Sequence, residues 1–469
     1  MNLEQVIDGK AVRRILIASG QTIEVGRATA AKLGIASDQS MSARHFAVVD
    51  EDGQCRARDL GSRNGTFVNG AQIAEVVLRD GDRIEAGDST FVVRLSRDRT
   101  AKYDESEGSL ALIPFLEFAN KTPFSVATLR WSDLDDNPKL TVVVKATFGI
   151  PAAGDDAYPA PRQLPIFDAD IMTSGKQAVL FESDRVPFKP CTDIVLVGRA
   201  HAPDGTPVSE LIAGVSVGRV RHSITVIGDR QWETSLGTPR MSPARPFLSM
   251  DLVYERAFGG IDGTSGAYCE ENHIGTGYVG GQSGARLKGL KLPNLEDPRN
   301  LIRTWNSRPR PVGVGFYGRG WAPRLAYAGT YDENYMKERH PRLPSDFSYR
   351  FFNGAHPDLQ VPGYLQGDEE VILLNVCSGA SRVHFRLPCL LPTIKIERWA
   401  TPPEQWIQER ATGDGSLPND FPLNEEPLKP VLDTLVFVPD KGVFYQVFRA
   451  VCGLSSLESL EVARVRVTC

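Results

Sequence analysis

The stretch Asp59-Leu60-Gly61-Ser62-Arg63-Asn64-Gly65-Thr66-Phe67-Val68-Asn69-Gly70 decides how the first part of this chain is expected to fold. Two of its dipeptides, Asn64-Gly65 and Asn69-Gly70, form turns because both residue types accept a positive φ at little cost. Between them, Thr66-Phe67-Val68 is a strand-like run. The pattern therefore predicts a polar loop, a short strand and a second turn. Residues 62–64 would lie on an exposed rim that is rich in hydrogen-bond donors, as an oxyanion site requires.

Three further blocks stand around this stretch in a fixed order. Gly26-Arg27 and Ser42-Ala43-Arg44-His45 precede it, and Asp80-Gly81-Asp82-Arg83-Ile84-Glu85-Ala86-Gly87 follows it. Together, the four blocks resemble the forkhead-associated (FHA) domain, a phosphothreonine-binding β-sandwich, over residues 10–96. The resemblance is specific because four motifs occur in one order, whereas any one of them alone would be weak.

The resemblance implies which residues would contact a phosphothreonine, a group with about −1.5 to −2 charge and three strong acceptor oxygens. Arg27 would bind the phosphate through its planar guanidinium with charge-assisted hydrogen bonds. Ser42 would donate its hydroxyl to another phosphate oxygen. Arg63, where the family has a polar residue that faces the phosphate, would supply a second cation. Asn64 would hydrogen-bond the ligand backbone beside the phosphothreonine.

Two more residues are expected to support this site without contacting the ligand. His45 would pack under the loop and hold Ser42 in place, and Asn69 would stabilise its own turn. The alternative is a degenerate FHA fold that serves only as a scaffold. The joint presence of Arg27, Ser42 and Asn64 favours a working phosphopeptide site.

The composition is that of a globular protein built largely from β structure. The 469 residues suggest about two to four domains of ~100–200 residues each. The 43 Gly and 32 Pro favour short strands joined by many turns. A formal net charge of −5 supports neither a nucleic-acid partner nor a membrane-surface partner. The seven cysteines include no Cys-x-x-Cys pair, so neither a disulfide framework nor a zinc ribbon is indicated.

The sequence gives no sign of membrane targeting. No apolar run approaches the ~20 residues that span a bilayer. The first residues lack the basic and apolar regions of a signal peptide. We therefore expect a cytoplasmic protein with no membrane insertion.

The polarity of the chain changes after the first module. Residues 97–110 are almost wholly polar and are typical of a linker between an FHA-like domain at 1–96 and a β-rich domain at 111–469. Within the linker, Arg97-Asp98-Arg99-Thr100 has the basic residues that suit a basophilic kinase, so Thr100 is a possible phosphosite. An inert, solvated threonine is the simpler interpretation.

The expected fold class is mainly all-β: an FHA-type β-sandwich followed by a large β-rich domain with few short helices. Several segments alternate polar and apolar residues, which is the period of a half-buried strand. One short helix is predicted at 403–410, where Pro403 stands at its start. The predicted strands of the large domain cover residues 141–150, 194–200, 223–227, 371–376, 383–387, 393–397, 434–438 and 443–451.

Fragments of catalytic and metal-binding motifs occur in the large domain, but none is complete. Gly275-x-Gly277-x-x-Gly280 matches a dinucleotide fingerprint, yet polar residues precede it and more glycines follow, so a Gly-rich loop is predicted. Cys269 and His273 form at most half a metal site. Asp368-Glu369-Glu370 suits a solvated turn better than an acid–base pair. We predict no catalytic residues, no metal ligands and no cofactor.

A second set of ordered blocks runs through the large domain. The blocks are Val142-Val143-Val144-Lys145-Ala146-Thr147-Phe148, Lys189-Pro190-Cys191-Thr192-Asp193-Ile194, Gly228-Asp229-Arg230-x-Trp232, Tyr254-Glu255-Arg256-Ala257-Phe258-Gly259-Gly260, Leu292-Pro293-Asn294-Leu295-Glu296, Asp346-Phe347, Phe351-Phe352 and Gly367-Asp368-Glu369. Over residues 115–400, they resemble the accessory domain family of type VI secretion systems. This resemblance implies an effector adaptor or chaperone with no agreed catalytic residues.

Taken together, the two resemblances imply a non-enzymatic bacterial adaptor. Its FHA module would bind a phosphothreonine-containing protein, and its large domain would bind a type VI effector or spike protein. One alternative is an enzyme with an unrecognised active site in 111–469, recruited by the FHA module. Another is a scaffold in a kinase pathway. Clustered carboxylates or metal ligands in a pocket of the large domain would favour the enzyme.

Overall fold

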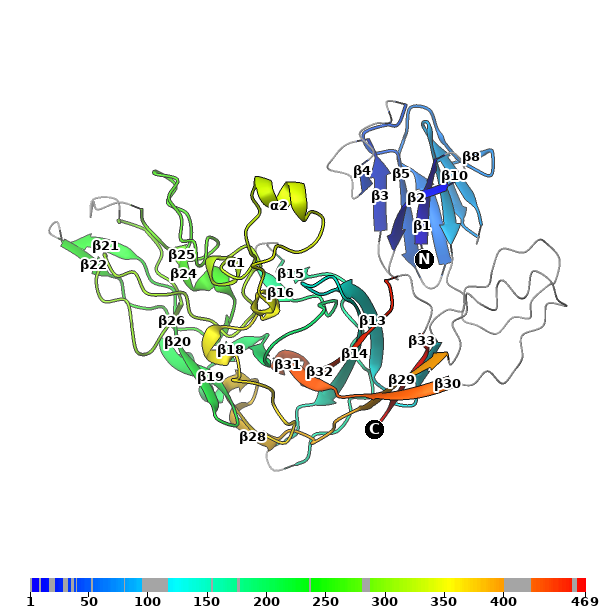
Figure 1. Cartoon of the computed structure of the whole chain (residues 1–469). Helices are drawn as coiled ribbons and strands as arrows, with labels where there is room; N and C mark the ends of the chain where they lie inside the picture. The colour runs from blue at the N-terminus through cyan, green and yellow to red at the C-terminus, as the bar shows by residue number, and fades with distance from the viewer. Residues whose placement is uncertain are drawn as a thin grey trace. The chain divides into compact units, whose positions relative to one another are not determined.

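The structure is a computed structural model of the chain, and it divides into two compact units, Met1–Ser109 and Leu110–Cys469 (Figure 1). Each unit has a hydrophobic core of its own, so each is described by itself. The linker at 97–110, Thr100 and the helix predicted at 403–410 lie outside the described residues. The structure describes residues 2–7, 10–16, 22–27, 33–34, 38, 40–51, 54–79, 81–94, 117–152, 155–174, 178–235, 238–280, 287–399, 423–457 and 462–469.

The first unit consists of two β-sheets. One has the order β2-β1-β11-β10-β7-β8, with bounds β1 (Asn2–Ile7), β2 (Lys10–Leu16), β7 (Thr66–Val68), β8 (Ala71–Ile73), β10 (Arg83–Ala86) and β11 (Ser89–Arg94). The other has the order β4-β3-β5-β6-β9, with bounds β3 (Thr22–Gly26), β4 (Leu33–Gly34), β5 (Phe46–Glu51), β6 (Gln54–Asp59) and β9 (Glu75–Val77).

Apolar residues from both sheets form the core between them. Phe46 on β5 packs edge to face against Phe91 on β11, with ring centroids 5.4 Å apart, and both rings are fully buried. The predicted turns are confirmed, because Gly65 and Gly70 have φ values of 79° and 80°. Asn69 also has a positive φ, of 51°. These turns and the polar loops lie at the ends of the strands of the sandwich.

The second unit is organised around a sheet with the order β13-β14-β32-β31-β17. In β14, residues 140–149 are buried without alternation, which explains the unbroken apolar run of the Val142–Val144 segment. β14 pairs with β32 over its length, from Lys139 opposite Gly453 to Gly149 opposite Val443. The bounds are β13 (Ser125–Ser132), β14 (Pro138–Gly149), β17 (Asp193–Leu196), β31 (Val431–Val438) and β32 (Val443–Gly453).

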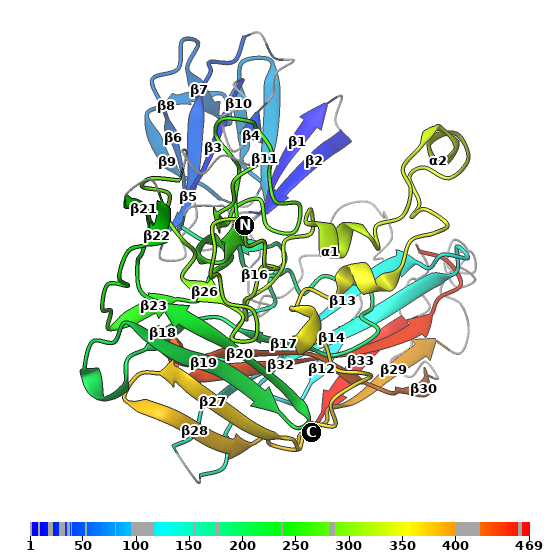
Figure 2. The same cartoon turned by 90° about the vertical axis from the view of Figure 1, so that its left-hand side faces the viewer.

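Two further sheets pack their apolar residues into the same core. One has the order β26-β20-β19-β27-β28, and Phe385 of β28 lies 5.4 Å from Phe444 of β32, ring centroid to ring centroid. Figure 2 shows the green and orange strands of this sheet lying over β32. Its bounds are β19 (Glu210–Val217), β20 (Val220–Ile227), β26 (Leu295–Glu296), β27 (Glu370–Cys377) and β28 (Ala380–Arg386). The other has the order β12-β33-β29-β30, with bounds β12 (Glu117–Asn120), β29 (Thr393–Trp399), β30 (Leu423–Leu428) and β33 (Val462–Thr468).

Short strand pairs and single helical turns complete the second unit. Among the described residues, no helix is long and apolar enough to cross a membrane. The strand pairs are β15 (Ile171–Met172) with β16 (Val179–Phe181), β18 (Arg199–His201) with β23 (Ser249–Asp251), β21 (Trp232–Ser235) with β22 (Thr238–Met241), and β24 (Phe258–Gly259) with β25 (Thr276–Gly277). The helical segments are α1 (Ala322–Leu325), α2 (Glu333–Glu338), η1 (Pro203–Gly205), η2 (Tyr254–Arg256), η4 (Tyr349–Phe352), η5 (Pro357–Leu359) and η6 (Pro439–Lys441).

The prediction of a mainly β protein is confirmed. Each of the eight strand segments predicted in the large domain overlaps a strand, although the segment 194–200 contains two, β17 and β18. The sequence did not predict β13, β19 or β33. In β19, Gly214 lies close to the backbone carbonyl of His222 on β20, and a glycine inside a strand weakens the sequence signal for that strand.

Candidate functional site

Two loops of the first unit meet at Gly26 and Arg27, at the end of β3. A Cβ atom at Gly26 would collide with the backbone carbonyl oxygen of Ala43, so only glycine allows these loops to approach this closely. The Arg27 amide then donates a hydrogen bond of 2.9 Å to the carbonyl of Ser42. The exposed Arg27 side chain is therefore fixed at its base beside the Ser42 loop.

A third loop, between β6 and β7, joins the same end of the sandwich. The Arg63 amide donates to Ser42 Oγ at 3.0 Å, and Asn64 Nδ2 donates to the carbonyl of Ser40 at 2.7 Å. Because the hydroxyl of Ser42 accepts this bond, its own proton can still be donated to a ligand. The side chains of Arg63 and Asn64 are exposed. We call the surface formed by Arg27, Ser42, Arg63 and Asn64 the rim.

His45 lies beneath the rim and is fully buried. Its Nδ1 accepts a hydrogen bond from the Ser42 amide at 3.0 Å, and its Nε2 lies 3.0 Å from the carbonyl oxygen of Gly65. A neutral imidazole satisfies both contacts when Nε2 carries the proton. His45 therefore connects the Ser42 loop to the loop that carries Arg63 and Asn64.

Asp59 shapes the loop that carries Arg63 and Asn64. It accepts hydrogen bonds from the amides of Gly61 and Ser62 and from the hydroxyls of Ser62 and Thr66. Burial alone would raise the pKa of Asp59, but these hydrogen bonds outweigh it and hold the pKa below its ordinary value. The carboxylate thus remains charged and keeps the loop in place. The Asx turn beginning at Asp59 is the sequence signal for this role.

Asn69 and Asp38 secure neighbouring turns. Asn69 Oδ1 accepts from the Arg83 amide at 2.9 Å, and its Nδ2 donates to Asp82 at 2.8 Å. Asp38 accepts from the amides of Ser40 and Asp88, and so anchors the residue whose carbonyl binds Asn64. Sequence reasoning missed Asp38, because two of its partners, Asp88 and Ser89, lie 50 and 51 residues away.

In the large unit, the Lys189–Ile194 block contributes to a buried ionic cluster. Asp193 is fully buried and accepts hydrogen bonds from Lys189 Nζ at 2.7 Å, Asn353 Nδ2 at 3.0 Å and the Gly354 amide at 2.9 Å. Nearby, the buried Glu182 pairs with Arg324. These charges are paired inside the fold, so they hold separate segments together and are not available as a surface catalytic group.

Three other sequence blocks meet beside a polar cavity of about 1160 Å³. Arg230 forms an ion pair with Glu296, whose pKa is raised by burial even though Arg230 opposes the shift. Asn294 donates to Asp229 at 3.1 Å and accepts from Arg256 at 3.0 Å. The blocks beginning at Gly228, Tyr254 and Leu292 therefore build one wall together, although up to 66 residues separate their paired members.

The residues considered for catalysis do not assemble into a constellation within the described part of the chain. Glu369 accepts hydrogen bonds from the amides of Gln366 and Gly367, which closes a turn, and Asp368 is exposed. His273 is exposed and has its ring beside Trp321. The Gly275–Gly280 stretch contains the two-residue strand β25, and no helix begins in residues 278–280 or 287–321 of the described chain.

Among the described residues, one group of three side chains could in principle hold a metal ion: His222, His356 and Asp358, with candidate ligand atoms within 4.8 Å of one another. His356 and Asp358 already have partners nearby, whereas the buried Nε2 of His222 has no hydrogen-bond partner among the described residues. His356 Nδ1 accepts from the Asp358 amide at 3.1 Å, and the Asp358 carboxylate binds Arg299 at 3.1 Å. Burial lowers the pKa of both histidines, and that of His356 to about 4. No sequence motif indicated this group, because 134 residues separate its histidines.

Comparison with family models gives two matches. The model described as “Uncharacterized protein conserved in bacteria (DUF2169)” matches residues 135–449. The FHA domain model matches residues 23–87, which include the whole rim. The comparison with curated proteins finds no match.

Solved FHA domains are similar to about a fifth of this chain. An FHA domain from “Structural and functional analysis of phosphothreonine-dependent FHA domain interactions” is 32% identical, covers 20% of this chain and 96% of its own, and has a TM-score of 0.19. The FhaA FHA domain complexed with the intracellular domain of Rv3910 is 33% identical, with coverage of 20% and 98% and a TM-score of 0.18. The FHA domain of the CT664 protein from Chlamydia trachomatis is 25% identical, with coverage of 20% and 97% and a TM-score of 0.20.

Proposed function

The chain belongs to the DUF2169 family and carries an FHA domain at its N-terminus, and from this combination we propose a non-enzymatic adaptor of a bacterial type VI secretion system. The FHA module binds a phosphothreonine-containing protein. The large domain binds an effector or spike protein in the cytoplasm. In this role the protein brings secretion cargo under the control of threonine phosphorylation.

One observation carries the phosphothreonine half of the proposal: three loops bonded to one another present Arg27, Ser42 and Asn64 on one rim. A guanidinium, a hydroxyl proton and an amide are the donors that a phosphothreonine and its backbone need. The exposed Arg63 adds positive charge. The secretion half rests on the ordered blocks of residues 115–400, which resemble the accessory family.

The positions of the charged groups in the large unit support the hypothesis that the protein is not an enzyme. Lys189, Asp193 and Glu182 are buried and paired with one another or with other protein groups. Asp368 is exposed, and the half-buried Glu369 closes a turn by accepting a hydrogen bond from the Gly367 amide. Single replacement of Asp368, Glu369 or His273 should therefore leave effector delivery unchanged. A folded variant that binds its cargo fully but no longer supports effector delivery would indicate an enzyme instead.

The direct test of phosphate recognition is calorimetry on the full chain. The titrants are two versions of a degenerate threonine-centred peptide mixture, one phosphorylated and one not. We expect binding only of the phosphorylated version. Equal affinity for both would make the first unit a scaffold.

The adaptor role needs a test in the native bacterium. Affinity capture with and without phosphatase treatment should recover a partner whose retention depends on phosphorylation. Deleting the gene should abolish delivery of one neighbouring effector while the secretion apparatus continues to fire. If every neighbouring effector is still delivered, the adaptor proposal fails, whatever the calorimetry shows.

A further inference from the structure

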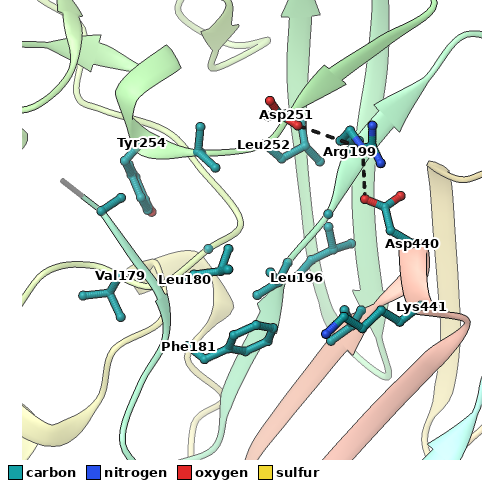
Figure 3. Close-up of a pocket in the computed structure, with 16 residues that line it drawn as sticks. Val179, Leu180, Phe181, Leu196, Arg199, Asp251, Leu252, Tyr254, Asp440 and Lys441 are labelled. Atoms are coloured by element: carbon teal, nitrogen blue, oxygen red, sulfur yellow. Dashed lines mark hydrogen bonds and ion pairs between the residues drawn. The ribbon is translucent and has the colours of Figure 1, made fainter. Parts of the chain in front are cut away.

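A small apolar pocket in the large unit lies beside the polar cavity described above and shares Leu180, Asp251 and Val253 with its lining. Its volume is about 250 Å³. A cavity of roughly 150 Å³ lined by apolar side chains can hold a benzene molecule, so this pocket has room for a phenyl or isobutyl group. Figure 3 shows the side chains that surround it, among them Val179, Leu180, Phe181, Leu196 and Leu252.

The pocket has charged groups on one side. Arg199 Nε lies 3.1 Å from Asp440 Oδ2 and 4.0 Å from Asp251 Oδ1. His201 Nε2 lies 3.1 Å from the second oxygen of Asp440. Both carboxylates therefore contact Arg199, and Lys441 is the remaining charged group of the lining.

Lys441 is exposed, and its ammonium has no hydrogen-bond or ion-pair partner within the part of the chain that the structure describes. In Figure 3, its side chain extends from η6 toward Phe181, so the charge points into the pocket rather than toward Asp440. An ammonium beside an apolar surface favours a ligand that carries one negative charge next to an apolar group.

From this geometry we propose that the pocket binds an apolar carboxylate: a phenyl-sized or isobutyl-sized group fills the cavity, and the carboxylate pairs with Lys441. The ligand is either a free carboxylic acid or the C-terminal residue of a polypeptide, because both present the same chemistry. The site does not depend on phosphothreonine binding or on the secretion role.

Two glycines allow the pocket to be closed without strain. A Cβ at Gly315 would meet only the Leu252 carbonyl oxygen, at 3.9 Å, and a Cβ at Gly198 would approach Pro439 no closer than 3.4 Å. Neither glycine has a positive φ. Gly315→Leu should therefore fill the cavity, and Gly315→Ala is a milder variant that keeps the test possible if the larger side chain disturbs folding.

The experiment titrates the full chain with 3-phenylpropionate, its neutral amide, acetyl-Ala-Ala-Phe with a free C-terminus, and the same peptide as its amide. Wild type should bind the acids with millimolar or tighter affinity. Each amide should bind about two- to fivefold more weakly than its acid, because the ion pair is with the exposed Lys441. Tighter binding of the peptide acid would identify a polypeptide C-terminus, and tighter binding of 3-phenylpropionate would identify a small acid.

The variants separate the contribution of the Lys441 charge to binding from that of the apolar cavity. Lys441→Met should weaken the acids about two- to fivefold and leave the amides unchanged, whereas the matched exposed-lysine control Lys429→Met should change nothing. Gly315→Leu should abolish binding of all four probes, and Gly315→Ala should weaken it. No binding of either acid to wild type, or equal binding of acid and amide with no effect of Lys441→Met, would overturn the proposal.

Discussion

The two units of this protein use charged residues in opposite ways. On the rim of the first unit, the charged Arg27 and Arg63 are exposed, and the loops that carry them are held by backbone hydrogen bonds and by the buried His45. In the large unit, Asp193 and its partners are buried and bonded to one another.

The difference shows that burial determines whether a motif residue contributes to ligand binding or to the stability of the fold. The aspartate of the first unit's loop, Asp59, accepts four hydrogen bonds from its own loop and thereby leaves neighbouring side chains exposed to a ligand. Asp193 joins segments that are 160 residues apart. Its replacement should therefore lower the stability of the large unit and leave phosphopeptide binding unchanged. The predictions below test this division in order of expected effect.

Replacing Asp193 by Ala should have the largest effect. The change would leave the ammonium of Lys189 buried without its closest partner and would remove the acceptor of the Gly354 amide. Loss of one member of a buried pair costs about 3–5 kcal/mol of stability. Thermal unfolding, followed by limited proteolysis, should show a destabilised large unit.

The same variant should bind phosphopeptides as wild type does, because the first unit has a core of its own. The matched control is Asp368→Ala, which removes an exposed carboxylate and should change stability by about 0.5 kcal/mol or less. If Asp193→Ala unfolds no more easily than this control, the buried cluster is not what stabilises the large unit.

Low pH should lower the stability of the large unit because His356 is buried. Burial first, and then the nearby His222, lower the pKa of His356 from its ordinary 6.5 to about 4. Between these two pH values, His356 binds a proton in the unfolded chain but not in the folded chain. The free energy of unfolding therefore falls as the pH drops from about 6.5 to about 4. At 1.36 kcal/mol per pKa unit, this one group accounts for about 3 kcal/mol.

Carboxylates titrate in the same range, so the test is a difference between variants. Urea unfolding of the large unit should show a smaller pH dependence between pH 4 and 6.5 in His356→Gln than in wild type. The exposed His340→Gln serves as the control and should keep the wild-type slope. Identical slopes for all three proteins would contradict the assignment to His356.

Arg27→Ala tests the rim itself. The loss of a hydrogen bond to a charged phosphate costs about 1.5–3 kcal/mol, which corresponds to binding about ten- to a hundredfold weaker. Calorimetry with the phosphorylated peptide measures it, and Arg79→Ala is a matched control on an exposed arginine outside the rim. Unchanged affinity in Arg27→Ala would mean that the rim does not bind the phosphate group. The exposed charges of the first unit would then have no demonstrated role in ligand binding.

The sequence could predict the turns and rim of the first unit because their determinants are local. Asn64-Gly65 and Asn69-Gly70 set the turn geometry, and the Asp59 loop closes within eight residues. The large unit is different. Its partners Glu182 and Arg324 are 142 residues apart, and Arg230 and Glu296 are 66 apart. No periodicity links such pairs, so the apolar strands could be predicted while the polar clusters could not.

The smallest effect is expected from Arg63→Gln, and it separates two kinds of rim residue. The backbone amide of Arg63, and not its side chain, bonds to Ser42 Oγ, so the substitution leaves the loop connection intact. What it removes is an exposed positive charge on the proposed phosphate-binding rim, and exposed charges contribute little and are screened by salt. We expect binding about two- to fivefold weaker at low ionic strength, with the difference vanishing near 1 M salt, where the screening length is about 3 Å. Calorimetry at both salt concentrations with the phosphorylated peptide measures this. A loss as large as that of Arg27→Ala, unaffected by salt, would instead mean that Arg63 contacts the phosphate directly, and the rim would then hold two equivalent guanidinium contacts.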